Sequence, residues 1–257
     1  MSFLDALILG VVEGVTEFLP ISSTGHLILT SKLFAIVQSE FVKSFEIIIQ
    51  LGAILSVVFL YWRTILNKNT LKKIIVGFVP TGVVGLLFYK IIKTYLIGNE
   101  TVVVWTLLIG GAALIIFELW YKEPTEAAED LDQVSYKQSF IIGLCQSVAI
   151  IPGVSRSAAT ILGGLGLGLR RRTIVEFSFL LAIPTMFAAT GLDLIKNAGA
   201  FSVDQLGVLI VGFVTSFVVA LGSIKFLMRF IQHHNFIPFG VYRILAAVAF
   251  WFFIIRG

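Results

Sequence analysis

Two carboxylates and several hydroxyls lie close together near the start of this chain, in EGVTEFLPISSTGHL (13–27). Glu13 and Glu17 are spaced i, i+4, so a helix presents both on one face with Cβ atoms about 5 to 6 Å apart. Two like charges in apolar surroundings are costly unless one is protonated or a divalent cation lies between them. The pair is therefore a candidate ligand set for Mg²⁺ or Ca²⁺.

A second polar loop, PGVSRSAAT (152–160), carries the opposite charge. Its Pro-Gly pair breaks the chain, Ser155 and Ser157 can cap the helix that follows, and Arg156 contributes a guanidinium. A helix N-terminus beside an arginine is an anion site, particularly for phosphate. The first loop also has a capping region at Ser22 to Thr24. If the two loops face each other, their groups are those of a phosphoryl-transfer centre.

The hydroxyls and the histidine of the first loop are candidates for the catalytic groups. Ser23 or Ser22 could be the nucleophile. His26 lies three residues after Ser23 on the same face of a helix and could be the general base or the acid for the leaving group. His26 could instead accept the phosphoryl group itself, and the residues leave these alternatives open. Ser22 and Thr24 are also candidates for binding the pyrophosphate.

The second loop is expected to bind the charged part of the substrate. Arg156 would neutralise charge on the transferred phosphoryl oxygens, assisted by Ser155, Ser157 and Thr160. Glu13 and Glu17 would repel a diphosphate unless a metal bridged them, which predicts dependence on a divalent cation.

The composition indicates an integral membrane protein. Hydrophobic residues make up 58% of the chain and charged residues 13%, and the mean hydropathy is +0.98. The N-terminal segment lacks Lys and Arg and is expected to be retained rather than cleaved. Cys145 is the only cysteine, which excludes an intramolecular disulfide. The net charge of +4 lies in short loops, so we expect no nucleic-acid partner.

We predict an all-α polytopic membrane protein with six transmembrane helices and two re-entrant helix-loop-helix hairpins. The six spans are 43–62, 74–95, 101–121, 173–195, 206–228 and 237–255. Residues 3–37 and 138–169 are interrupted by the polar loops, and each gives two pieces that are short for a full crossing. Irregular backbone at membrane depth is tolerated where it is buried in protein or lines a wet cavity.

The two interrupted stretches resemble each other. A shift of 133 residues aligns Gly10 with Gly143 and Ser22 with Ser155. Each stretch is followed by three predicted spans, and an odd number per repeat inverts the second copy relative to the first. We therefore predict one membrane domain over 1–257, with inverted repeats at 1–121 and 137–257 joined by a linker at 122–136.

The positive-inside rule orients this arrangement. Eleven Lys and Arg residues lie on one predicted side and six on the other, which makes the first side cytoplasmic. The larger set is Arg63, Lys68, Lys72, Lys73, Lys122, Lys137, Arg170, Arg171, Arg172, Lys225 and Arg229, and the smaller set is Lys32, Lys43, Lys90, Lys93, Lys196 and Arg256. Both termini and the site are then expected on the outer face.

The two loop motifs, together with FSFLLAIP (177–184), resemble the signatures of the bacterial undecaprenyl-pyrophosphate phosphatase family, the bacitracin-resistance type. The resemblance covers essentially the whole chain. It implies an enzyme of the bacterial inner membrane that hydrolyses the C55 polyprenyl diphosphate carrier to its monophosphate and inorganic phosphate, which recycles the carrier for peptidoglycan synthesis. It also places the family's acidic pair on Glu13 and Glu17, its serine and histidine on Ser23 and His26, and its arginine loop on Ser155, Arg156 and Thr160.

Other interpretations of the chain stay open at this point. Inverted repeats with broken helices are also typical of transporters, so the alternative is a transporter or flippase of a polyprenyl phosphate or another anion. Arg243 lies within the last predicted span, where it is either functional or snorkels to the membrane boundary. Membrane lipids are expected partners, and the sequence does not choose between a monomer and a homodimer.

Overall fold

The computed structural model describes residues 1–257 except 92–95, 97–98, 124–129, 197–202 and 256–257. The described residues form helices and connecting loops, with no strand among them. The α-helices are α1 (Phe3–Thr16), α2 (Ser23–Leu33), α3 (Glu40–Ile65), α4 (Lys68–Ile91), α5 (Glu100–Trp120), α6 (Tyr136–Ser147), α7 (Arg156–Gly166), α8 (Arg171–Lys196), α9 (Leu206–Phe230) and α10 (Ile237–Phe250). Short 3₁₀ segments lie at Leu131–Gln133, Val148–Ile150 and Val203–Gln205, and a π-helical turn at Trp251–Ile255 follows α10.

Five helices are long and apolar enough to cross a membrane. They are α3, α4, α5, α8 and α9, and they correspond to five of the six predicted spans. The sixth predicted span, 237–255, contains the shorter α10 and the turn after it, and its apolar helix covers Ile237–Phe253. The end of the span predicted at 74–95 and part of the linker predicted at 122–136 lie outside the described residues.

The outer surface of these helices is apolar. Large hydrophobic side chains such as Phe59, Leu86 and Trp120 are exposed around the bundle. A surface of this kind is stable in contact with lipid and unstable in water. The class expected from composition, an all-helical integral membrane protein, is confirmed.

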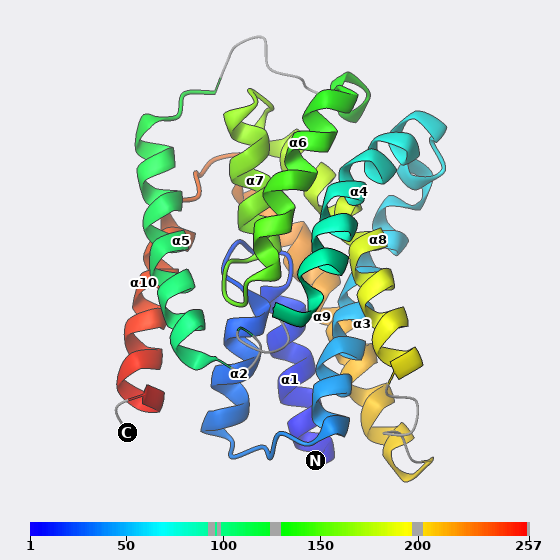
Figure 1. Ribbon diagram of the computed structural model, residues 1–257, viewed down its shortest axis with the longest axis vertical. Coiled ribbons are helices and arrows are strands. Elements are labelled where there is room, and N and C mark those ends of the chain that lie inside the picture. The colour runs from blue at the N-terminus through cyan, green and yellow to red at the C-terminus, as the bar shows by residue number, and fades with distance from the viewer. Residues whose placement is uncertain (92–95, 97–98, 124–129, 197–202, 256–257) are drawn as a thin grey trace.

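Two pairs of short helices enter the bundle from opposite ends (Figure 1). The first hairpin, α1 with α2, lies in the lower half of the view, and the second hairpin, α6 with α7, lies in the upper half. Both break where the sequence predicted, at the segments around Pro20 and around Pro152–Gly153. Their loops meet in the interior, where Ser157 donates a hydrogen bond to the carbonyl of Phe18 over 2.8 Å.

The helix contacts form a regular pattern. When α1 to α5 are matched in order with α6 to α10, the α1–α9 contact corresponds to α6–α4, and the α3–α9 contact corresponds to α8–α4. The α3–α8 and α5–α10 contacts correspond to themselves. The most extensive helix contacts of the two halves thus correspond.

Glycines permit the closest of these contacts. A Cβ on Gly10 of α1 would lie 2.7 Å from the carbonyl oxygen of Gly212 of α9, and a Cβ on Gly143 of α6 would overlap the carbonyl of Gly77 of α4. Small residues at such crossings let two backbones approach closely. The hairpin helices are therefore held by backbone-to-backbone packing, which fixes how deep their loops lie within the bundle.

Replacing Gly143 with alanine is expected to destabilise the protein. The added methyl group meets backbone rather than a movable side chain, so α4 and α6 must separate at a cost of about 1–3 kcal/mol. Thermal unfolding in detergent measures this loss. Gly222→Ala is the matched control, because Gly222 of α9 has open space around it. Equal melting temperatures for the two variants would contradict the close α4–α6 packing.

Candidate active site

The first hairpin places a serine against a carboxylate. The α1 helix ends at Thr16, and Glu17 follows it into the loop. Ser22 is the N-cap of α2, with φ of 72°, and its side-chain oxygen accepts from the N–H of Gly25. Ser23 is the first residue of α2, and its Oγ donates a 2.6 Å hydrogen bond to Oε2 of Glu17. Both side chains are buried, so Glu17 is positioned to accept the proton of this hydroxyl.

The second hairpin places an arginine against the same carboxylate. Ser155 caps α7 with φ of 74°, and Arg156 is the first residue of that helix. The Nη2 of Arg156 donates to Oε1 of Glu17 over 2.9 Å, and its Nη1 donates to the carbonyl of Ser178 over 2.8 Å. Its Nε is buried and has no hydrogen-bond partner among the described residues. The contacts with Glu17 and Ser178 thus do not use all the N–H donors of the guanidinium.

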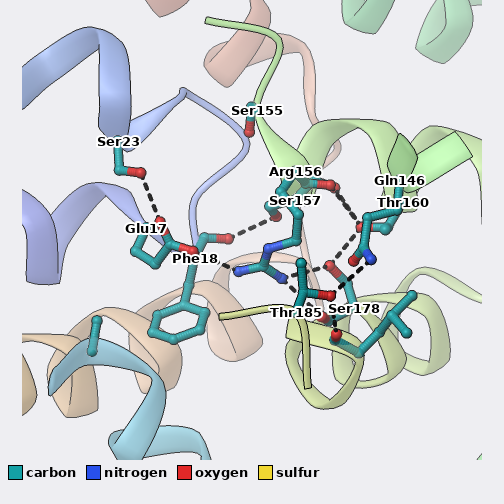
Figure 2. A network of polar contacts seen from close by, with 12 residues as sticks. Glu17, Phe18, Ser23, Gln146, Ser155, Arg156, Ser157, Thr160, Ser178 and Thr185 are labelled. Carbon is teal, nitrogen blue, oxygen red and sulfur yellow. Dashed lines mark hydrogen bonds and ion pairs between the residues drawn. The ribbon is translucent and has the colours of Figure 1, made fainter. Parts of the chain in front are cut away.

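Figure 2 shows Glu17 between Ser23 and Arg156. The carboxylate uses one oxygen for each partner, and the three residues come from two hairpins that are far apart in sequence. This arrangement places a hydroxyl group and a guanidinium on either side of one carboxylate, which can act as a base. It is the central geometric feature of the site.

Two other predicted residues of the second loop serve the framework. Ser157 donates to the carbonyl of Phe18, and Thr160 shares a 2.6 Å hydrogen bond with the hydroxyl of Ser178 (Figure 2). Both are buried, and neither lines the pocket described next. Their contacts fix the position of α7 against the first hairpin and α8.

A pocket with an open space of about 430 Å³ lies where the two loops meet. Its polar lining includes six predicted site residues: Glu17, Ser22, Ser23, Thr24, Ser155 and Arg156. The N-termini of α2 and α7 both reach it, and a helix N-terminus carries a partial positive charge and free N–H groups. Together with the guanidinium, these groups make the pocket suitable for an anion with several oxygens.

Glu13 lies one helical turn before Glu17 and is completely buried. Neither of its carboxylate oxygens accepts a hydrogen bond from a described residue. A buried carboxylate without partners is costly, and a cation or a proton would remove that cost. The described residues contain no group of three or more His, Cys, Asp and Glu side chains that could hold a metal. Glu13 is not among the residues that line the pocket, so a divalent cation held by Glu13 and Glu17 stays a prediction.

His26 is not among the residues that line the pocket. Its Nδ1 lies 2.7 Å from the carbonyl of Ser22, which can only accept, so Nδ1 carries the hydrogen. In the neutral ring Nε2 then accepts from the hydroxyl of Tyr242, 2.8 Å away, and the two rings stack. The sequence placed His26 on the same helix face as Ser23, but the serine contacts Glu17 instead. The catalytic role of His26 stays a prediction.

Several residues of the site were not found from the sequence. Gln50 of α3 and Met186 of α8 line the pocket, Ser178 holds Arg156, and Tyr242 holds His26. Gln50 was detectable as a polar residue inside an apolar span, and Ser178 as the polar member of FSFLLAIP. Met186 has no such signal. Arg243, which was a further candidate, is completely buried, so its side chain does not snorkel to the membrane boundary.

The fold and the pocket define a helical integral membrane protein in which two hairpins bring a serine, a carboxylate and an arginine together. The chain belongs to the family of bacitracin resistance protein BacA, whose model matches residues 6–249. It is 52% identical over 251 residues to a protein of Sulfurihydrogenibium sp. named undecaprenyl-diphosphatase, which covers 98% of this chain and 99% of the relative. Proteins of the same name from Aquifex aeolicus and Persephonella marina are 51% and 48% identical over 247 and 256 residues, covering 96% and 99% of this chain and 96% and 100% of theirs. The family inferred from the two loop motifs is confirmed.

Proposed function

We propose that this protein is an undecaprenyl-diphosphate phosphatase, which hydrolyses the C55 polyprenyl diphosphate to the monophosphate and inorganic phosphate. The observation that carries the proposal is the contact of Glu17 with both Ser23 and Arg156 beside two helix N-termini. A site that only bound an anion would not need a base on a serine hydroxyl. The names of the relatives support the substrate, and the family supports a role in carrier recycling and bacitracin resistance.

The proposed reaction has two steps. The Oγ of Ser23 attacks the terminal phosphorus, its proton passes to Glu17, and the bond from that phosphorus to the bridging oxygen breaks. The lipid monophosphate leaves with the bridging oxygen. Water then attacks the phosphoserine, the Oγ of Ser23 takes its proton back from Glu17, the proton of the water passes to solvent, and inorganic phosphate is released. Arg156 lines the pocket and would stabilise the charge on the phosphoryl oxygens through its guanidinium charge.

A divalent cation would complete the pocket. Glu13 and Glu17 would hold Mg²⁺ or Ca²⁺, and the unpartnered oxygens of Glu13 support this assignment. When bound, the cation would offset the repulsion between these carboxylates and the diphosphate. The roles given above to Ser23, Glu17 and Arg156 stay the same when the cation is bound.

The membrane arrangement proposed for this chain has six spans, with α10 and its following turn as the sixth, and two re-entrant hairpins. The matching helix contacts of α1 to α5 and α6 to α10 support an inverted repeat, as do the equivalent left-handed N-caps Ser22 and Ser155. The start of α1 and the end of α10 lie at the same end of the molecule (Figure 1). With the distribution of Lys and Arg, this supports a plasma-membrane protein whose termini and site open outward.

The same repeat pattern favours a second candidate function, a transporter or flippase of a polyprenyl phosphate. The two candidates differ in what they require of Ser23. Transport needs the anion-binding groups but no base on the hydroxyl, so a Ser23→Ala variant would still move the lipid. Hydrolysis needs the anion-binding groups and also the base on the hydroxyl.

The purified protein is expected to release inorganic phosphate from C55 polyprenyl diphosphate, and a chelator is expected to slow this release at least about tenfold. Added Mg²⁺ or Ca²⁺ should restore the rate, since either ion could occupy the pair Glu13 and Glu17. A colorimetric phosphate assay in detergent measures both effects. Absence of phosphate release with both cations present would contradict the proposed function. A chelator-insensitive rate would contradict only the cation.

A further inference from the structure

Arg243 of α10 is completely buried and donates every one of its hydrogens to backbone carbonyls. Its Nη1 contacts Pro20 and Val154, at 3.3 and 2.9 Å, and its Nη2 contacts Gly153 and Thr106, both at 2.9 Å. Its Nε donates to Leu107 over 3.4 Å. A guanidinium has five N–H donors in a rigid plane, and all five are used here. One side chain therefore joins the first loop, the second loop and α5.

The bonded carbonyls belong to the segments that shape the pocket. Pro20 lies two residues before Ser22, and Val154 lies directly before Ser155. Ser22 and Ser155 both have positive φ, at 72° and 74°, which is uncommon for a residue with a side chain. Such a conformation persists when surrounding contacts hold it. The hydrogen bonds from Arg243 are contacts of this kind, since they reach Pro20 in the first loop and Val154 in the second loop.

The guanidinium charge has no paired carboxylate in the described part of the chain. None of the ion pairs formed there involves Arg243, and its partners are neutral carbonyls. Gly153, one of these partners, lines the pocket. A full positive charge thus lies directly behind the pocket wall, in surroundings where water screens it weakly.

The α5 helix leaves room for this side chain. A Cβ on Gly110 would overlap Nη2 and Cζ of Arg243, so only glycine accommodates the guanidinium in this position. The overlap is with the end of a flexible side chain and not with backbone. An alanine at this position would therefore displace the guanidinium from its backbone partners.

We propose that Arg243 is a positioning residue of the diphosphate site. It holds the tips of the two loops at a fixed position relative to each other and adds positive charge behind the pocket. The inference rests on the proposed function and deepens it. It assigns two separable effects to one side chain. The charge attracts the diphosphate, and the planar set of donors holds Ser23 and Arg156 at the distance at which both contact Glu17.

Three variants separate the charge of Arg243 from its geometry. Arg243→Lys keeps the charge but offers three donors from a single nitrogen, so it cannot hold both loops and α5 together. Arg243→Met removes the charge as well. Gly110→Ala leaves Arg243 intact and shifts its guanidinium. Gly222→Ala is the matched control, because a Cβ there meets nothing within 4 Å.

The experiment measures kcat and KM for phosphate release, and the affinity for inorganic pyrophosphate by calorimetry, per folded molecule. We expect Arg243→Lys and Gly110→Ala to lower kcat about 10- to 100-fold, because small displacements of catalytic groups have effects of this size. Pyrophosphate affinity should stay within about threefold of the parent in Arg243→Lys and fall about tenfold in Arg243→Met, since only the latter loses the charge. Gly222→Ala should match the parent.

Some outcomes would overturn the inference. Folded Arg243→Lys and Gly110→Ala with the parent's kcat would show that the contacts of Arg243 do not position the site. A loss of activity that only follows the loss of folded protein, with kcat and KM per folded molecule unchanged, would reduce Arg243 to a structural residue. If the parent itself releases no phosphate, the proposed function fails. The inference is then decided by the affinity for pyrophosphate alone, and equal affinities in Arg243→Met and Arg243→Lys would contradict it.

Discussion

Replacing Glu17 with glutamine is expected to lower kcat by at least about 1,000-fold, because it removes the base on Ser23 and the counter-charge of Arg156 together. An amide can accept a hydrogen bond but cannot take the proton of the hydroxyl. The buried guanidinium also loses its ion pair, and an uncompensated buried charge is free to reorient. Phosphate release at saturating substrate measures the loss, since it isolates the chemical step from binding.

Glu46→Gln is the matched control for this change. Glu46 lies in α3, and its Oε1 accepts from Ser31 over 3.1 Å and from Gln38 over 3.3 Å. It does not line the pocket. The variant removes the same charge and breaks a similar serine contact, so kcat within about threefold of the parent is expected if the effect at Glu17 is chemical. Equal losses in both variants would assign the effect to folding and would contradict the role of Glu17.

Replacing Ser23 with alanine is expected to abolish phosphoryl-enzyme formation and to lower kcat by about 1,000-fold or more. Ser23 lines the pocket and already shares its proton with Glu17, whereas His26 is engaged with Ser22 and Tyr242 outside the pocket. His26→Ala should therefore cost less, about tenfold, through a shift of α2. Rapid quenching with substrate labelled at the terminal phosphate measures the trapped intermediate.

The chemistry of the trapped group distinguishes the two nucleophiles. Phosphoserine survives acid, whereas phosphohistidine is lost in acid and survives alkali. Ser31→Ala is the matched control, because Ser31 is a second buried serine of α2 that also donates to a glutamate. Retention of the label in Ser23→Ala together with its loss in His26→Ala would overturn the assignment of Ser23 and return the nucleophile to His26.

The apolar spans were predictable because they are encoded locally. A run of about twenty apolar residues is sufficient to indicate a membrane helix, and five of the six predictions correspond to such helices. The break points of both hairpins were equally local, since proline, glycine and capping serines determine where a helix stops and starts. The sixth predicted span differs in length, because its apolar helix covers only Ile237–Phe253.

The sequence by itself determined which groups the site contains: the two glutamates, the serines, the arginine and the two helix N-termini. Only the tertiary structure decided their partners. Spacing along a helix placed His26 near Ser23, yet the proton of Ser23 goes to Glu17, and Glu17 meets Arg156 from 139 residues away. Arg243 became a residue of this site in the same way, through contacts with both loops. The physical reason is that hydrogen bonds between distant segments depend on how two hairpins and α10 pack in three dimensions, which no local pattern records.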